Sequence, residues 1–271
     1  MTETRFAHDL DGVDPSEPFT RRSAAYTSRR LLRRARRLLG DHPVLLPIVL
    51  WGTPGSAKRA ITTSTEAVIE GFPRSGNTFA YFALQDANGG PLPVSSHVHV
   101  PAQVERAVAL GKPTLFVVRE PVACLASLLT AAPHVRVRPA FEEYIHHHRR
   151  VLPLVDDLVI GTFEQITTDF GMVVDALNAR FGTSFARFEQ TPENVDRVFA
   201  RIDAHYEELY GDRASERVVP RPSPARKAEK RWLTDQLTSP RHAPLLEQAQ
   251  EVYAALAARA PEPGTPRQPP G

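Results

Sequence analysis

One stretch of the sequence reads Gly71-Phe72-Pro73-Arg74-Ser75-Gly76-Asn77-Thr78-Phe79 and joins a short apolar run to a segment with helical periodicity. The run at residues 67–72 has the apolar, β-branched character of a buried strand, and apolar side chains recur at helical intervals over residues 78–87. A glycine-containing loop between a strand and a helix directs backbone N–H groups and the positive helix end toward an anion. The stretch therefore predicts a phosphate-binding loop.

This loop departs from the nucleoside triphosphate motif at one position. Gly71, Gly76 and Thr78 have the spacing of G-x-x-x-x-G-K-[ST], but Asn77 stands where that motif has Lys. Because the motif Lys reaches the β- and γ-phosphates, its replacement argues for a different phosphate ligand. Arg74 supplies a permanent positive charge inside the loop instead. An ordinary Pro/Gly/Asn turn with one exposed Arg is the alternative interpretation.

Two further strand–helix units follow the loop. Residues 113–119 form an apolar run that ends in Arg119, and Pro121 favours the start of a helix that includes Ser127. A third strand is predicted at residues 157–163. Open α/β sheets place ligand-binding groups at the carboxyl ends of their strands, so Arg119 is a candidate binding residue. A surface Arg at a strand end is the alternative.

Histidines occur in two groups. Residues 95–101 alternate polar and apolar side chains as an extended segment does, which would place His97 and His99 on one face. Three consecutive histidines at residues 146–148 fall in a helical stretch. Consecutive helical side chains diverge by about 100° and cannot all bind one metal, so we expect these three on the surface.

Composition narrows the class of protein. A chain of 271 residues suits one α/β domain with additional segments at its ends. The formal net charge of +2 gives no overall field that would indicate nucleic-acid binding. Cys124 is the single cysteine, which excludes an internal disulfide framework and a Cys-based zinc site. A single cysteine also makes a reducing cytoplasm the expected compartment. No apolar run approaches the roughly 20 residues needed to span a bilayer.

The chain divides into four parts by composition. Residues 1–20 are predicted to be a flexible acidic arm, residues 64–260 the α/β domain, and residues 261–271 a disordered Pro-rich tail. Residues 21–63 combine a basic amphipathic helix with a linker, and eight arginines lie between Arg21 and Arg37. This helix predicts peripheral contact with an anionic membrane, and a solvated helix packed on the main domain is the alternative.

The loop and the second unit together resemble the sulfotransferases that use 3′-phosphoadenosine 5′-phosphosulfate (PAPS), including their bacterial members. Residues 73–79 are similar to the 5′-phosphosulfate loop of that family, P-[KR]-[ST]-G-[TSN]-[TS]. Val118-Arg119-Glu120-Pro121 with Ser127 resembles the family's 3′-phosphate motif, and Phe163-Glu164-Gln165-Ile166 resembles its segment after the third strand. The resemblance covers residues 66–258 and implies an α/β, P-loop NTPase-like three-layer fold with a central parallel sheet flanked by helices.

The resemblance also assigns roles to individual residues. His99, in the family's His-x-Pro pattern, is implied as the general base, with His97 as second choice, and Arg74 as the catalytic cation at the phosphosulfate bridge. Ala228 stands where the C-terminal nucleotide loop of the family has Gly. The residues implied to bind PAPS are Arg74, Ser75, Gly76, Asn77, Thr78, Phe79, Arg119, Ser127, Arg226 and Lys227.

The implied chemistry is in-line transfer of a sulfuryl group from PAPS to a hydroxyl of a small-molecule or saccharide acceptor. PAPS is the co-substrate, 3′-phosphoadenosine 5′-phosphate (PAP) is the product, and no metal is expected. Two other functions stay open at this point. One is a P-loop kinase or nucleotide-binding protein, although Asn77 replaces its Lys and Arg119 occupies the position of an acidic Mg²⁺ ligand. The other is a non-catalytic module that binds membranes or polyanions.

Overall fold

The computed structural model describes residues 31–33, 35, 39–52, 59–132, 134–210 and 227–262. Its centre is a parallel sheet of four strands in the order β2-β1-β3-β4. The strands are β1 (Ala67–Gly71), β2 (Val94–Ser96), β3 (Thr114–Val118) and β4 (Val159–Thr162). The predicted α/β class is therefore confirmed, and β1, β3 and β4 match the three strands predicted from the sequence.

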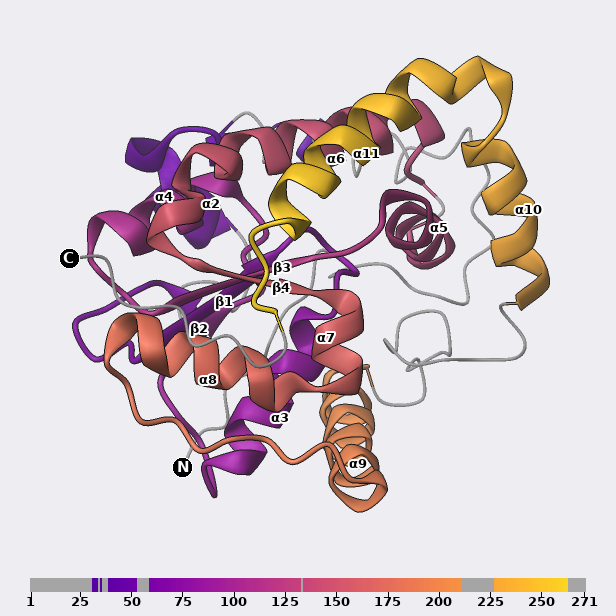
Figure 1. Cartoon of the computed structure of the whole chain (residues 1–271). Helices are drawn as coiled ribbons and strands as arrows, with labels where there is room; N and C mark the ends of the chain where they lie inside the picture. The colour runs from indigo at the N-terminus through magenta and orange to yellow at the C-terminus, as the bar shows by residue number, and fades with distance from the viewer. Residues whose placement is uncertain are drawn as a thin grey trace.

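Helices connect the strands and cover both faces of the sheet (Figure 1). The helices α3 and α8 pack on one face, and α4 and α11 pack on the other. In the described part of the chain, α marks an α-helix and η a short 3₁₀ helix. These elements are η1 (Pro43–Leu45), α2 (Leu46–Gly52), α3 (Asn77–Ala87), α4 (Pro101–Ala109), α5 (Pro121–Ala131), α6 (Val137–Val151), η3 (Leu152–Asp157), α7 (Phe163–Thr168), α8 (Phe170–Phe181), α9 (Pro192–Tyr210), α10 (Lys227–Leu237), η5 (Pro240–His242) and α11 (Ala243–Ala257).

Alternation along the strands creates two cores. Ile69 of β1 and Leu115 of β3 pack with α3 and α8, whereas Phe116 of β3 packs with α4 and α11. Successive side chains of a strand point to opposite faces, so a strand that is buried on both faces reads as one continuous apolar run. For this reason these strands could be predicted from the sequence.

The segment predicted as extended at residues 95–101 folds differently. Only Val94–Ser96 form a strand, and Pro101 begins α4, where its fixed φ suits the first helical turn. Between these elements His97 and His99 both adopt the left-handed conformation, with φ values of 63° and 56°. The expectation of regular alternation there was wrong, and the reason lies in the contacts described below.

The surface position expected for the histidines at 146–148 was also wrong for two of them. His147 and His148 are buried, with 5% and 0% of their surface exposed. The His147 ring stacks on Phe116 and the His148 ring stacks on Tyr144. His146 is partly exposed and pairs with Asp41. Helix α6 packs against α4, α5 and α11, and its His147 ring reaches Phe116 of β3, so its residues are enclosed on more than one side.

Several expectations concern residues that the structure describes only in part. Residues 31–33 and 35 of the basic segment are helical, but Arg21, Arg37 and most arginines between them lie outside the described residues. The acidic arm and most of the Pro-rich tail lie outside them as well. Within the described ranges, no helix is both long enough and apolar enough to cross a membrane.

Candidate functional site

The predicted phosphate loop connects β1 to α3 at the carboxyl edge of the sheet. A Cβ atom at Gly71 would lie 2.3 Å from the Val117 carbonyl oxygen, so the neighbouring strand β3 requires glycine there. Gly76 has φ 109° and is the N-cap of α3, and Arg74 is left-handed with φ 72°. These conformations turn the chain sharply enough to begin a helix directly after a buried strand.

Three loop side chains point into the protein. The Ser75 hydroxyl contacts the Cys124 thiol at 3.7 Å, and Asn77 Nδ2 donates to the Phe72 carbonyl at 3.2 Å. The Phe79 ring packs against Phe188 and Phe199. The Ser75 N–H donates to the Phe72 carbonyl at 3.2 Å, so Asn77 and Phe79, in the first turn of α3, are the two of these residues that have a backbone N–H to offer to an anion.

The first turn of α3 presents those N–H groups without a side-chain cap. No side chain among the described residues hydrogen-bonds to the amides that follow Gly76. The first N–H groups of a helix have no partner within the helix, and they carry the positive end of its dipole. A phosphate oxygen is a suitable acceptor for them.

Arg74 and the second predicted motif meet directly. Arg74 Nε donates to Ser127 Oγ at 3.1 Å, and a guanidinium nitrogen of Arg119 donates to the Arg74 carbonyl at 2.9 Å. Arg119 follows the last residue of β3, and Ser127 lies on α5. Residues separated by 45 and 53 positions in the chain thus form one cluster beside the loop.

The environment of Arg119 fixes its orientation. Its guanidinium carbon lies 3.7 Å from the centre of the Phe163 ring, and the Tyr144 hydroxyl donates to its carbonyl at 2.6 Å. Burial lowers the pKa of Arg119, but an arginine stays protonated in proteins. Its Nε has no hydrogen-bond partner among the described residues. A half-buried cation whose buried Nε still has a hydrogen to donate fits a phosphate ligand.

His99 lies on the other side of the loop. Its Nδ1 is 2.7 Å from the Gly71 carbonyl oxygen, which can only accept a hydrogen bond, so Nδ1 carries the proton. The neutral ring then has its lone pair on Nε2. This tautomer is the one that a general base acting through Nε2 requires.

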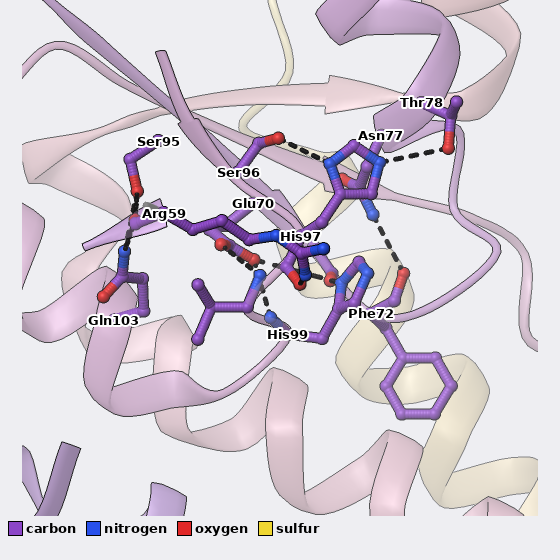
Figure 2. Close-up of polar contacts among 12 residues, drawn as sticks. Arg59, Glu70, Phe72, Asn77, Thr78, Ser95, Ser96, His97, His99 and Gln103 are labelled. Atoms are coloured by element: carbon purple, nitrogen blue, oxygen red, sulfur yellow. Dashed lines mark hydrogen bonds and ion pairs between the residues drawn. The ribbon is translucent and has the colours of Figure 1, made fainter. Parts of the chain in front are cut away.

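His97 has a different setting (Figure 2). Its Nε2 lies 3.1 Å from Thr78 Oγ1, and its Nδ1 hydrogen-bonds with Ser96 Oγ. Both ring nitrogens are therefore engaged, one of them with the first turn of α3. Of the two histidines left open by the sequence, His97 lies beside the loop with both ring nitrogens hydrogen-bonded, and His99 is held to the Gly71 carbonyl through Nδ1.

Sequence reasoning missed two residues that hold the histidine segment. Glu70 on β1 is fully buried and accepts hydrogen bonds from the backbone N–H groups of Val98 and His99. Arg59, 2% exposed, donates to the His97 carbonyl at 3.0 Å. A signal for Glu70 was present, since a carboxylate inside the apolar run at 67–71 needs buried partners.

Arg226 and Lys227 are the last two residues that the resemblance implies in PAPS binding. Arg226 lies outside the described residues, and Lys227 is the first residue of α10, although its side chain is not described. Helix α10 packs against α5, the helix that carries Ser127.

Burial raises the pKa of the Cys124 thiol to about 11, so this thiol is not a thiolate nucleophile at neutral pH.

Comparisons of the chain with protein-family models, with curated proteins and with solved structures find no match in any of the three. The function assigned to this site therefore depends on its own residues and their geometry.

Proposed function

We propose that this protein transfers a sulfuryl group from PAPS to a hydroxyl of a small-molecule or saccharide acceptor, on a P-loop-like α/β fold. The observation that carries the proposal is the direct hydrogen bonding of the loop at Arg74 to both Arg119 and Ser127. Two anion-binding elements that are distant in sequence become one surface suited to a nucleotide with phosphates at two positions.

In this proposal the α3 end of the loop holds the 5′-phosphosulfate. The amides of Asn77, Thr78 and Phe79 face it, and Arg74 contributes its charge from within the loop. Arg119 and Ser127 hold the 3′-phosphate, for which the forked guanidinium of Arg119 provides paired donors. PAPS carries a 3′-phosphate, which ATP lacks. In this proposal Arg119 binds that phosphate, whereas a kinase would bind the β- and γ-phosphates of ATP with a Lys and Mg²⁺.

The reaction proceeds in one in-line step. Nε2 of His99 takes the proton from the acceptor hydroxyl while the acceptor oxygen forms a bond to sulfur. The bond between sulfur and the bridging phosphate oxygen breaks, and PAP leaves with the electron pair. Arg74 and the loop amides stabilise the negative charge that develops on that oxygen, which is commonly the largest contribution in such sites. General-base catalysis by a histidine typically adds about 10²- to 10⁴-fold.

A P-loop kinase is the competing enzyme class. Its loop Lys would stand at position 77, where Asn77 is instead turned back to the Phe72 carbonyl. The strand end that would supply an acidic Mg²⁺ ligand carries Arg119, whose guanidinium lies over Phe163. Both differences favour a nucleotide that is bound without a γ-phosphate.

The test compares ligands by thermal unfolding and then assays transfer. PAP at 100 times its dissociation constant should stabilise the wild type by about 2.7 kcal/mol, whereas ATP with Mg²⁺ should give a much smaller shift. Arg119→Ala should lose the PAP shift. Arg106→Ala is the matched control, because Arg106 is exposed in the last turn of α4. Release of PAP from PAPS with a panel of hydroxyl acceptors then measures turnover, and a shift with ATP and Mg²⁺ alone would support the kinase instead.

A second role, peripheral contact with an anionic membrane, is favoured by one surface. Leu46 of α2 is buried against Val98 and Val100, while Val44 and Ile48 point outward with 85% and 50% of their surface exposed. Pro43 and Pro47 are exposed beside them. This outer face is apolar and directly follows a segment with eight arginines, a combination that suits a bilayer with anionic headgroups.

Vesicle sedimentation tests this second role in the full-length protein. Binding to phosphatidylglycerol/phosphatidylcholine vesicles and not to pure phosphatidylcholine is expected, with loss in the double variant Val44→Asp/Ile48→Asp. Leu110→Asp is the control, because Leu110 is 51% exposed at the far end of α4. Equal binding by the double variant and the control would contradict the role.

A further inference from the structure

A charged side chain lies inside the apolar centre of the sheet. Glu70 is 0% exposed on β1, where its partner in the parallel register is Phe116 of β3. Its neighbour Val68, on the same face, packs with Ile61 and Ala107. A carboxylate in such surroundings requires strong hydrogen-bond donors, and the sheet itself provides none for side chains.

The donors come from the segment between β2 and α4. The Val98 amide donates to Oε1 of Glu70 at 2.8 Å, and the His99 amide donates to Oε2 at 2.9 Å (Figure 2). Two consecutive N–H groups can reach one carboxylate only if the chain curls around it. The positive φ values of His97 and His99 produce that curl. Left-handed conformations of residues other than glycine persist where surrounding contacts hold them.

The other side of the segment is held by a buried cation. Arg59 donates to the His97 carbonyl at 3.0 Å, and its own carbonyl accepts from Ser95 Oγ and from Gln103 Nε2. Arg59 thus donates to the carbonyl of His97, and Glu70 accepts from the next two N–H groups of the chain, those of Val98 and His99. The backbone that carries His99 is fixed from both sides.

We propose that Glu70 is the positioning residue for His99 in sulfuryl transfer, an inference that rests on the proposed function. Glu70 sets the backbone of His99 so that Nδ1 meets the Gly71 carbonyl and Nε2 carries the lone pair. Its Oε2 also lies 3.9 Å from Nδ1 of His99. When His99 takes the acceptor proton, the nearby carboxylate stabilises the imidazolium that forms.

The charged and titratable groups around His99 come from several elements. Glu70 approaches from β1, the His97 ring lies 5.6 Å away between ring centres, and His147 of α6 is close enough to interact electrostatically. Arg59 reaches the same segment through the His97 carbonyl. Glu70 is the anion in this set, so its removal leaves the imidazolium beside neutral or cationic groups.

The test replaces the carboxylate and separates positioning from folding. Glu70→Gln should keep a PAP-induced thermal shift and a KM for PAPS within about twofold of wild type, while kcat falls at least about tenfold. The acid limb of its pH–rate profile should move about one unit lower, because the imidazolium has lost its counter-charge. Glu66→Gln is the matched control, since Glu66 is exposed just before the same strand. Wild-type kcat and acid limb in a folded Glu70→Gln would overturn the proposal.

Glu70→Asp provides a second test in case Glu70→Gln does not fold. It keeps the charge and the acceptor oxygens but withdraws them by one methylene, so kcat should fall while the acid limb stays near that of wild type. Wild-type kcat in Glu70→Asp would also overturn the proposal.

A wild type that neither transfers sulfuryl groups nor responds to PAP would refute the proposed function separately. Amide hydrogen exchange then tests the remaining claim about the backbone. Exchange at Val98 and His99 should accelerate in Glu70→Gln or Glu70→Asp but not in Glu66→Gln, and unchanged exchange would overturn the positioning role.

Discussion

The guanidinium of Arg119 donates a hydrogen bond to the main-chain carbonyl of Arg74 at 2.9 Å. This bond joins the end of β3 to the left-handed turn that precedes α3, where Arg74 has φ 72°. A bond to a charged donor contributes about 1.5–3 kcal/mol, comparable to the cost of holding a residue in that conformation. Arg119 therefore shapes the loop, and in the proposed function it also offers its charge to the 3′-phosphate.

This double role predicts a specific pattern in Arg119→Lys. A lysine cannot hold both the Arg74 carbonyl and a phosphate with a planar fork, so affinity for PAP should fall roughly 10- to 100-fold. Affinity for adenosine 5′-monophosphate, which lacks the 3′-phosphate, should fall less but not stay constant, because the loop also loosens. Calorimetric titration with both nucleotides in the variant and in Arg106→Lys measures this. An unchanged preference for PAP would contradict it.

Gly76 offers a prediction with an internal control. Gly76→Ala places a Cβ 3.2 Å from the Phe163 ring at a φ of 109°, so both binding and stability should decrease. Gly89→Ala also meets a positive φ, 72°, but its Cβ would have no atom within 4 Å. Both variants should lose about 1–2 kcal/mol of stability, while Gly76→Ala alone should lose the thermal shift with PAP. Equal PAP shifts in the two variants would argue against the loop as the phosphate site.

The strands could be predicted because their chemistry is local. Residues 67–71 and 114–118 are buried on both faces, and that environment selects the apolar runs that were recognised. The sequence also indicated the loop and Arg119, since glycine spacing and strand ends are local features too. Their direct contact was beyond prediction from the residues, because Arg74 and Arg119 are 45 positions apart.

The histidine segment was mispredicted because its conformation depends on distant side chains. Alternation at residues 95–101 resembles a strand, but Glu70 and Arg59 bind its backbone and curl it. The buried position of His147 and His148 has a similar origin. Their rings are enclosed by Phe116 and Tyr144, and nothing in three consecutive histidines indicates such partners.

The two site histidines should respond differently to substitution. His99→Ala should lower kcat by about 10²- to 10⁴-fold with little change in PAP affinity, because it removes the proposed base. His97→Ala removes the partner of Thr78 at the start of α3, so its main effect should be weaker PAP binding. Steady-state kinetics together with PAP titration separates the two. A larger loss of kcat in His97→Ala than in His99→Ala would reverse the assignment.

The buried histidines of α6 predict acid sensitivity of the fold. Burial lowers the pKa of His148 from 6.5 to about 4, and burial together with the neighbouring histidines lowers the pKa of His147 well below 6.5. At a pH between about 4 and 6.5, the unfolded chain therefore binds more protons than the folded protein. Stability is therefore fully present above about pH 6.5 and falls as the pH drops toward 4, by up to about 1.4 kcal/mol per unit for each histidine.

Urea unfolding between pH 7.5 and 5 measures this dependence. His148→Gln keeps a side-chain donor for the Tyr144 carbonyl but cannot titrate, so its free energy of unfolding should decline less steeply with acidification than that of wild type. His42→Gln is the control, because His42 is exposed and its substitution should leave the slope unchanged. If His148→Gln and wild type lose stability in parallel, the acid sensitivity originates elsewhere, since a buried neutral His148 must contribute to the slope.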